Sequence, residues 1–182
     1  MTTYNLDWLI KKCQSKENIK YIAFWGHQPS KDGKLTKTCF SQWWYASFVV
    51  DEVEYKTAEH WMMAEKARLF DDSKIIDKIV NAKTPAEAKK LGRLVNNFDA
   101  AKWDLHKFEI VVNGNYHKFK QNNNIKKILL ETKDNVIVEA SPVDKIWGIG
   151  LSPEHPQVNY PWKWKGENLL GFALMEVRDL LK

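Results

Sequence analysis

The chain has few of the residues and motifs that mark metal sites or membrane segments. Its two cysteines, Cys13 and Cys39, show neither CxxC spacing nor nearby histidines, and there is no HExxH or Gly-x-Ser-x-Gly motif. No apolar run approaches the roughly 18 residues of a membrane-spanning helix. The first residues lack the order of a secretory signal. The sequence therefore predicts a cytoplasmic protein without metal, cofactor or membrane partner.

Long linkers, internal repeats and low-complexity tracts are also missing. Only 8 glycines and 6 prolines occur in 182 residues, and 44% of the residues are hydrophobic. A chain of this length usually forms one domain and buries enough surface to fold without disulfides. We therefore predict a single domain over residues 1–182, in which residues 1–20 are an N-terminal extension.

Charge and aromatic content indicate the kind of ligand. The formal net charge of +5 attracts phosphate groups but is too small to diagnose nucleic-acid binding. The 9 tryptophans are unusual, because each is a large apolar plane that favours burial or a flat partner. We expect most of them in the core and a few beside a stacked base.

Hydrophobic periodicity predicts a predominantly helical α+β fold with a few short strands. The expected helices lie within 1–20 and at 58–70, 73–81, 85–95, 101–121, 124–132 and 168–181. The expected strands are 21–25, a hairpin over 40–55 that turns at Asp51-Glu52, and 136–140. Residues 27–38 and 141–166 are expected to be irregular, because turn residues gather there.

Glu59 is the first candidate for catalysis. At about 100° per residue, Glu59 and Lys66 project in nearly the same direction, between Met62 and Met63 and away from the polar face. A carboxyl group in an apolar stripe tends to have a raised pKa, which suits proton transfer. Two structural explanations stay open: a buried Glu59–Lys66 pair, and an acid that the helix dipole favours at the first turn.

Asp144 is the second candidate. It lies in a segment rich in proline and glycine beside Trp147, and loops of this kind often carry functional side chains. A turn-forming aspartate that bonds to its own backbone is the competing explanation.

Several short blocks, taken in order, resemble the NADAR, or YbiA-like, family. They span nearly the whole chain and comprise Phe24-Trp25-Gly26, the segment from Thr57 to Ala67, Leu91-Gly92-Arg93, Trp103, the segment from Asp144 to Gly148, and the segment from Asn168 to Arg178. Ala58, the Phe40-Ser41-Gln42-Trp43 segment and the insert 151–165 depart from the family pattern. These departures bear on the identity of the substrate.

The resemblance implies a YbiA-like fold and an N-glycosidase that needs no metal. Family members are similar to enzymes that hydrolyse the base–ribose bond of phosphorylated riboflavin-pathway intermediates, or that remove ADP-ribose from guanine in DNA. The resemblance places the functional acids at Glu59 and Asp144. The resemblance places pocket aromatics at Trp103 and Trp147. We further predict substrate contacts at Phe24, Trp25, Gly26, Lys66, Arg93 and Asn168.

These residues suggest a mechanism in which Glu59 is the base and electrostatic stabiliser and Asp144 assists the leaving group or a ribose hydroxyl, or the reverse. Trp103 or Trp147 would stack the base, and Lys66 or Arg93 would hold phosphate. Trp103 as a core residue and Arg93 as a solvated helix-end residue remain alternatives.

The expected partner is a small ribosyl-phosphate or ADP-ribosyl molecule, and ADP-ribosylated DNA is a further candidate. A non-catalytic module that binds ADP-ribose or a nucleotide is the alternative function.

Overall fold

The structure is a computed structural model that describes residues 3–15 and 17–182. The chain divides into two compact units, and each is described by itself. Unit 1 comprises Met1–Ser41 and Asn124–Lys182, and unit 2 comprises Gln42–Asn123. The single-domain boundary of 1–182 stays a prediction.

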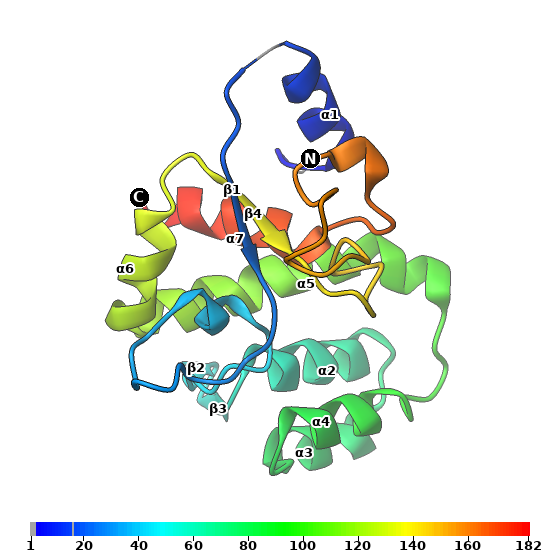
Figure 1. The fold of residues 1–182 in the computed structure, drawn as a ribbon. Helices are drawn as coiled ribbons and strands as arrows, with labels where there is room; N and C mark the ends of the chain where they lie inside the picture. The colour runs from blue at the N-terminus through cyan, green and yellow to red at the C-terminus, as the bar shows by residue number, and fades with distance from the viewer. Residues whose placement is uncertain (1–2, 16) are drawn as a thin grey trace. The chain divides into compact units, whose positions relative to one another are not determined.

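Unit 1 is built on a short parallel pair of strands, β1 (Tyr21–Phe24) and β4 (Val136–Glu139), which run side by side in Figure 1. The first three residues of β4 are buried, as expected for a strand covered on both faces. Helix α7 (Leu169–Leu180) packs on β4 and buries most of its own residues. The apolar repeat that predicted this helix therefore faces the core.

Four further elements complete unit 1 in the described part of the chain: the helices α1 (Leu6–Gln14) and α6 (Asn123–Glu131), and the short 3₁₀ turns η1 (Lys37–Phe40) and η2 (Pro161–Lys163). Helix α1 begins at Asn5, whose side chain accepts a hydrogen bond from the Trp8 amide, and it packs near η2. The predicted loop over 27–38 thus runs into a helical turn, because Thr36 caps η1 as it would cap a longer helix.

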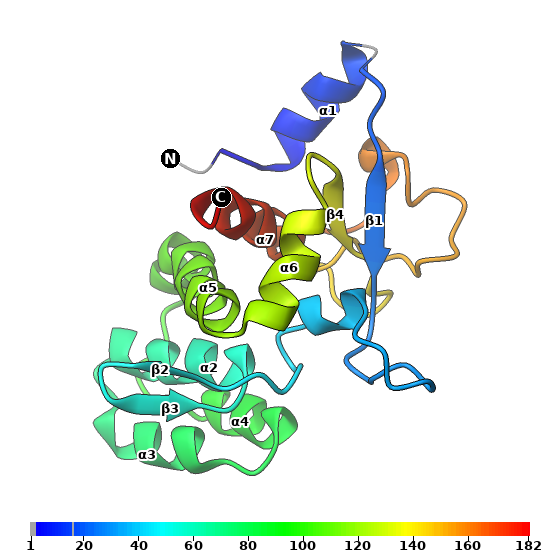
Figure 2. The ribbon, with the colours of Figure 1, turned by 90° about the vertical axis from the view of Figure 1, so that its left-hand side faces the viewer.

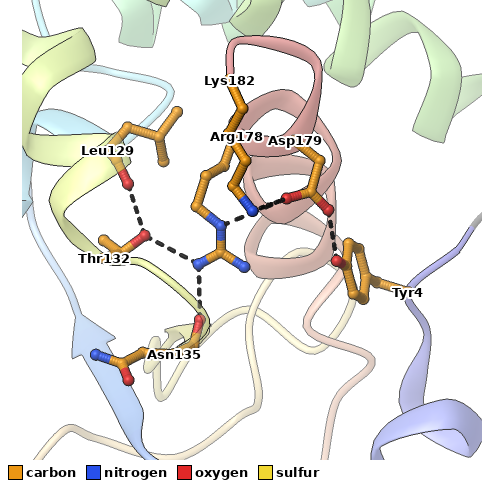
Figure 3. A network of polar contacts seen from close by, with 7 residues as sticks. All are labelled: Tyr4, Leu129, Thr132, Asn135, Arg178, Asp179 and Lys182. Carbon is orange, nitrogen blue, oxygen red and sulfur yellow. Dashed lines mark hydrogen bonds and ion pairs between the residues drawn. The ribbon is translucent and has the colours of Figure 1, made fainter.

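A buried arginine ties α7 to the segment that links α6 and β4 (Figure 3). Arg178 Nη1 donates to Thr132 Oγ1 at 2.9 Å and to the carbonyl of Asn135 at 2.8 Å. The neighbouring Asp179 accepts a hydrogen bond from the Tyr4 hydroxyl and pairs with Lys182. Burial and the Asp179 carboxylate raise the pKa of Tyr4 to about 12.

Unit 2 places the hairpin of β2 (Phe48–Val50) and β3 (Val53–Tyr55) beside helices α2 (Ala58–Leu69), α3 (Ser73–Asn81), α4 (Pro85–Gly92) and α5 (Ala100–Gln121) (Figure 2). Helix α2 packs against α3, α4 and α5. Asp51 and Glu52 both have positive φ, of 49° and 65°, so the hairpin closes through the two-residue turn typical of such connections. The hairpin prediction is confirmed, although residues 41–47 are not strand.

Glycine allows α2 and α5 to approach closely. A Cβ at Gly114 in α5 would lie 2.2 Å from the Trp61 ring of α2. The Trp61 indole donates to the carbonyl of Ile110 on the same helix at 2.9 Å. The close packing of α2 on α5 therefore requires a residue without a side chain at position 114.

Most predicted helix boundaries agree with the structure to within a residue or two. Helix α4 ends at Gly92 rather than at residue 95, because the Leu94 amide turns back to the carbonyl of Leu91 at 2.8 Å and tightens the last turn. Helix predominates over a few short strands, so the α+β prediction is confirmed. No helix in the described residues is long and apolar enough to span a membrane.

Candidate functional site

The first turn of α2 positions Glu59. Thr57 is the N-cap, and its hydroxyl accepts a hydrogen bond from the His60 amide. The Glu59 amide donates to the backbone carbonyl of Gln42 at 3.0 Å, and the Glu59 side chain is only 2% exposed. Residues 58–64 are all buried, so this half of α2 is covered on every side. The sequence predicted burial on one side of the helix only, whereas the structure buries all sides of its first two turns. Because every neighbour of Glu59 on α2 is buried as well, burial alone does not assign Glu59 a function.

His60, the neighbour of Glu59, has a structural role. Its Nδ1 lies 2.8 Å from the Thr57 hydroxyl and its Nε2 lies 3.1 Å from the carbonyl of Ala82. Burial lowers the pKa of His60 and favours the neutral ring. The imidazole thus fastens the start of α2 to the end of α3.

Lys66 lies two turns after Glu59 on the same side of α2, about 10 Å further along the helix axis. Its ammonium donates to the carbonyl of Gly92 at 3.0 Å. It lies 4.1 Å from the centre of the Phe98 ring and 5.8 Å from that of Trp103. Burial lowers the pKa of Lys66. The partners of this ammonium are thus a carbonyl and two rings, which argues against the buried Glu59–Lys66 pair considered above.

Two of the predicted substrate residues, Lys66 and Trp103, lie close together here, and a third, Arg93, follows the Gly92 whose carbonyl binds the ammonium. Gly92 directly precedes Arg93, whose side chain is exposed at the end of α4. Trp103 stands in the first turn of α5, behind the N-cap Asp99, and is half-buried. A half-buried ring beside a cation is compatible with both core packing and stacking, so both explanations of Trp103 stay open.

The other predicted residues belong to unit 1 and gather at the carboxyl ends of β1 and β4. Asp144 Oδ1 accepts hydrogen bonds from the amides of Ile146 and Trp147 at 2.9 and 2.8 Å. The turn is joined to β4, because the Ile149 amide donates to the carbonyl of Glu139 at 2.9 Å. One carboxylate oxygen of Asp144 therefore shapes the turn, as the competing explanation expects.

Asn168 bridges β4 and α7. The residue has a positive φ of 58° and is fully buried. Its Oδ1 accepts from the Glu139 amide at 2.9 Å and its Nδ2 donates to the carbonyl of Ile137 at 3.0 Å. The side-chain amide of Asn168 thus pairs with backbone groups of β4 as a neighbouring strand would. A role of Asn168 in substrate binding stays a prediction.

Phe24, Trp25 and Gly26 form the carboxyl end of β1 and the residues after it. Phe24 is buried against Phe40, whereas the Trp25 ring is 51% exposed. Gly26 has a positive φ of 81° with open space around its α-carbon, so the chain turns sharply here. Such edges are where ligands bind in open parallel sheets.

The sequence prediction missed two buried amides in unit 2. Asn115 Nδ2 donates to Gln42 Oε1 and to the carbonyl of Val111, both at 2.8 Å. Asn115 is fully buried in α5, one turn from the buried Val111 and Phe119. The position of Asn115 on the apolar face of a predicted helix, between Val111 and Phe119, is the sequence feature that indicates a buried polar contact.

Metal ligands do not gather in the described part of the chain. No group of three or more histidine, cysteine or acidic side chains lies close enough there to hold an ion.

Comparison with known proteins identifies the family. The model of the NADAR domain matches residues 23–182. The chain belongs to the NADAR family. It is 46% identical over 169 residues to N-glycosidase R617 of Acanthamoeba polyphaga mimivirus, covering 90% of this chain and 97% of the relative. It is 33% identical over 144 residues to N-glycosidase Npun_R5314 of Nostoc punctiforme, covering 79% and 85% of the two chains.

The solved NMR structure of the Escherichia coli protein YbiA has the same fold as this NADAR chain. The TM-score is 0.69 at 26% identity, and the match covers 89% of this chain and 84% of YbiA. The predicted family and YbiA-like fold are therefore confirmed. The prediction of an N-glycoside hydrolase is confirmed by relatives that are named N-glycosidases.

Proposed function

We propose that this NADAR chain hydrolyses the bond between ribose and a base in a phosphorylated ribosyl or ADP-ribosyl substrate, and that Glu59 is the reacting acid. The observation that supports it best is that Glu59 and Lys66 lie on one side of α2, two turns apart and each with its own partners. The acid is 2% exposed, and the cation is held between a carbonyl and two rings. Two turns correspond to about 10 Å along the helix axis, and we propose that the ribose phosphate spans this separation.

Glu59 would act on the sugar carbon of the scissile bond. Cleavage of the C1′–N bond develops positive charge on the ribose, which a fixed carboxylate stabilises. Glu59 would also take a proton from the attacking water, whose oxygen bonds to C1′. The departing nitrogen keeps the bonding electrons and gains a proton, so the products are the free base and a ribose with a C1′ hydroxyl.

Lys66 would bind the phosphate. Its hydrogen bond to Gly92 uses one of three ammonium protons, which leaves two for phosphate oxygens. Burial lowers the pKa of Lys66, and a bound phosphate would favour the charged form again. Trp103, 5.8 Å from this ammonium, would contribute a flat surface, and Arg93, next in sequence to Gly92, would contribute a second positive charge.

We propose that Asp144 is the second acid, and that the predicted residues of unit 1 around it contact the substrate. Asp144 Oδ1 is engaged in the turn that ends at Trp147. Asp144→Asn preserves this oxygen as an acceptor and removes the negative charge, so it tests the chemical role separately from the turn.

Glu59→Gln tests the proposal. The wild type and the variant would be incubated with ribosylaminopyrimidine phosphates, NAD and ADP-ribosylated DNA, and the free base would be measured. We expect kcat to fall by about 10²–10⁴-fold with the melting temperature nearly unchanged. Glu65→Gln is the matched control, because Glu65 lies on the same helix and pairs with Arg68.

A folded Glu59→Gln variant with nearly full activity would refute the assignment of Glu59. Substrate binding by the wild type without release of any base would instead indicate a non-catalytic module that binds the nucleotide.

A further inference from the structure

Gln42 and Asn115 in unit 2 leave two polar atoms without a partner inside the protein. The two side chains are 7% and 0% exposed and share a 2.8 Å hydrogen bond from Asn115 Nδ2 to Gln42 Oε1. Gln42 Nε2 and Asn115 Oδ1 are buried and have no hydrogen-bond partner. Two side chains that are hydrogen-bonded to each other thus carry one unpaired donor group and one unpaired acceptor.

The orientation of both amides follows from their surroundings. The carbonyl of Val111, 2.8 Å from Asn115 Nδ2, accepts only a donor, so the Asn115 amide cannot be turned over. The second proton of the same nitrogen then needs an acceptor, which is Gln42 Oε1. No exchange of nitrogen and oxygen would satisfy the two remaining atoms.

These two atoms are unfavourable for folding, because a buried polar atom without a partner costs about 1–3 kcal/mol. Gln42 is also joined to the proposed reacting acid through the backbone, since its carbonyl accepts a hydrogen bond from the Glu59 amide at 3.0 Å. A buried polar group without a partner calls for an explanation, and a ligand that pairs with it supplies one.

We propose that Gln42 and Asn115 bind the leaving base through an edge that carries an acceptor next to an N–H donor. The base acceptor would receive a hydrogen bond from Gln42 Nε2, and its N–H would donate to Asn115 Oδ1. Both the lactam edge of an oxo-base and the amidine edge of an amino-base have this pattern. The inference rests on the proposed function, because it names what lies on the nitrogen side of the bond that Glu59 attacks.

The test uses the full chain, isotope-labelled for NMR, and free bases as probes. 1-Methyluracil carries the lactam edge at N3, 1,3-dimethyluracil lacks any ring N–H, and adenine carries the amidine edge. We expect the Gln42 side-chain amide signals, assigned by their loss in Gln42→Glu, to shift with 1-methyluracil or adenine. Binding of 1,3-dimethyluracil should be at least about tenfold weaker than that of 1-methyluracil, because Asn115 Oδ1 stays unpaired. A stronger shift with adenine would identify the amidine edge as the preferred source.

Gln42→Glu replaces the donor nitrogen with an oxygen and adds a negative charge, while the other oxygen still accepts from Asn115. We expect it to weaken base binding by about 10–100-fold. Asn113→Asp is the matched control, an amide-to-acid change at an exposed position of the same unit, and should bind like the wild type.

Equal shifts with 1-methyluracil and 1,3-dimethyluracil, or no shift of the Gln42 amide with any base at millimolar concentration, would overturn the inference. Base release from ribosyl substrates by the same wild-type preparation reports on the proposed function independently. An active enzyme without these shifts therefore refutes only the assignment of Gln42 and Asn115.

Discussion

Replacing Arg178 with methionine tests how unit 1 is held together. The arginine is 2% exposed, and Nη1 makes two charged hydrogen bonds, to Thr132 Oγ1 and to the carbonyl of Asn135. Such bonds contribute about 1.5–3 kcal/mol each. The variant no longer has to bury a charge, which offsets part of this loss. The Thr132 hydroxyl keeps its bond to the carbonyl of Leu129. We therefore expect the free energy of unfolding to fall by about 2–4 kcal/mol.

Urea unfolding at pH 7, followed by tryptophan fluorescence, measures this change. With a slope of about 2 kcal/mol per molar urea, the midpoint should fall by about 1–2 M. Lys182→Ala is the control, because it breaks a more exposed ion pair with Asp179, at 2.8 Å, in the same network. Such pairs contribute at most about 1 kcal/mol. If both variants shift the midpoint equally, the buried arginine does not stabilise unit 1 and the reasoning fails.

Three further predictions concern unit 2. Because burial lowers the pKa of His60, the unfolded chain takes up a proton first as pH falls below about 6.5. The free energy of unfolding should therefore decrease as pH falls from about 6.5 towards the lower pKa of the folded state. In urea titrations between pH 7.5 and 5.5, the His60→Gln variant should not show this decrease. Gly114→Ala would gain up to about 1 kcal/mol of helix propensity in an open helix. Here the new methyl would stand 2.2 Å from Trp61, so we expect a net loss of about 1–3 kcal/mol, and an unchanged melting temperature would contradict the close approach of α2 and α5. Lys66→Met should raise KM at least about tenfold for phosphorylated substrates, because a charged hydrogen bond to phosphate is lost, and should leave KM for the dephosphorylated nucleoside unchanged; equal effects on both would rule out the phosphate role.

Local chemistry made much of the fold predictable. Thr57 and Thr84 cap their helices as expected from their position before apolar repeats. The Asp51-Glu52 turn closes the predicted hairpin. Each of these features depends on residues within a few positions of one another, so the local sequence is enough to predict it.

The candidate site was predictable only in part. Periodicity placed Glu59 and Lys66 on one side of α2, because the angle between them depends on the helix alone. It could not show that α2 is buried on every side at its start, or that Lys66 lies against a carbonyl and two rings. Those facts depend on which helices pack against α2.

The sequence by itself determined the caps, the turn, the helix spacing and the family resemblance. The tertiary structure decided which polar groups are buried and what they contact. The bond between Gln42 and Asn115 spans 73 positions, and that between Asn168 and Ile137 spans 31. No repeat along the chain encodes such pairs, because they form only when packed elements bring distant side chains together. Packing gives the Asn168 side chain two backbone partners, and it leaves Gln42 Nε2 and Asn115 Oδ1 buried without a hydrogen-bond partner.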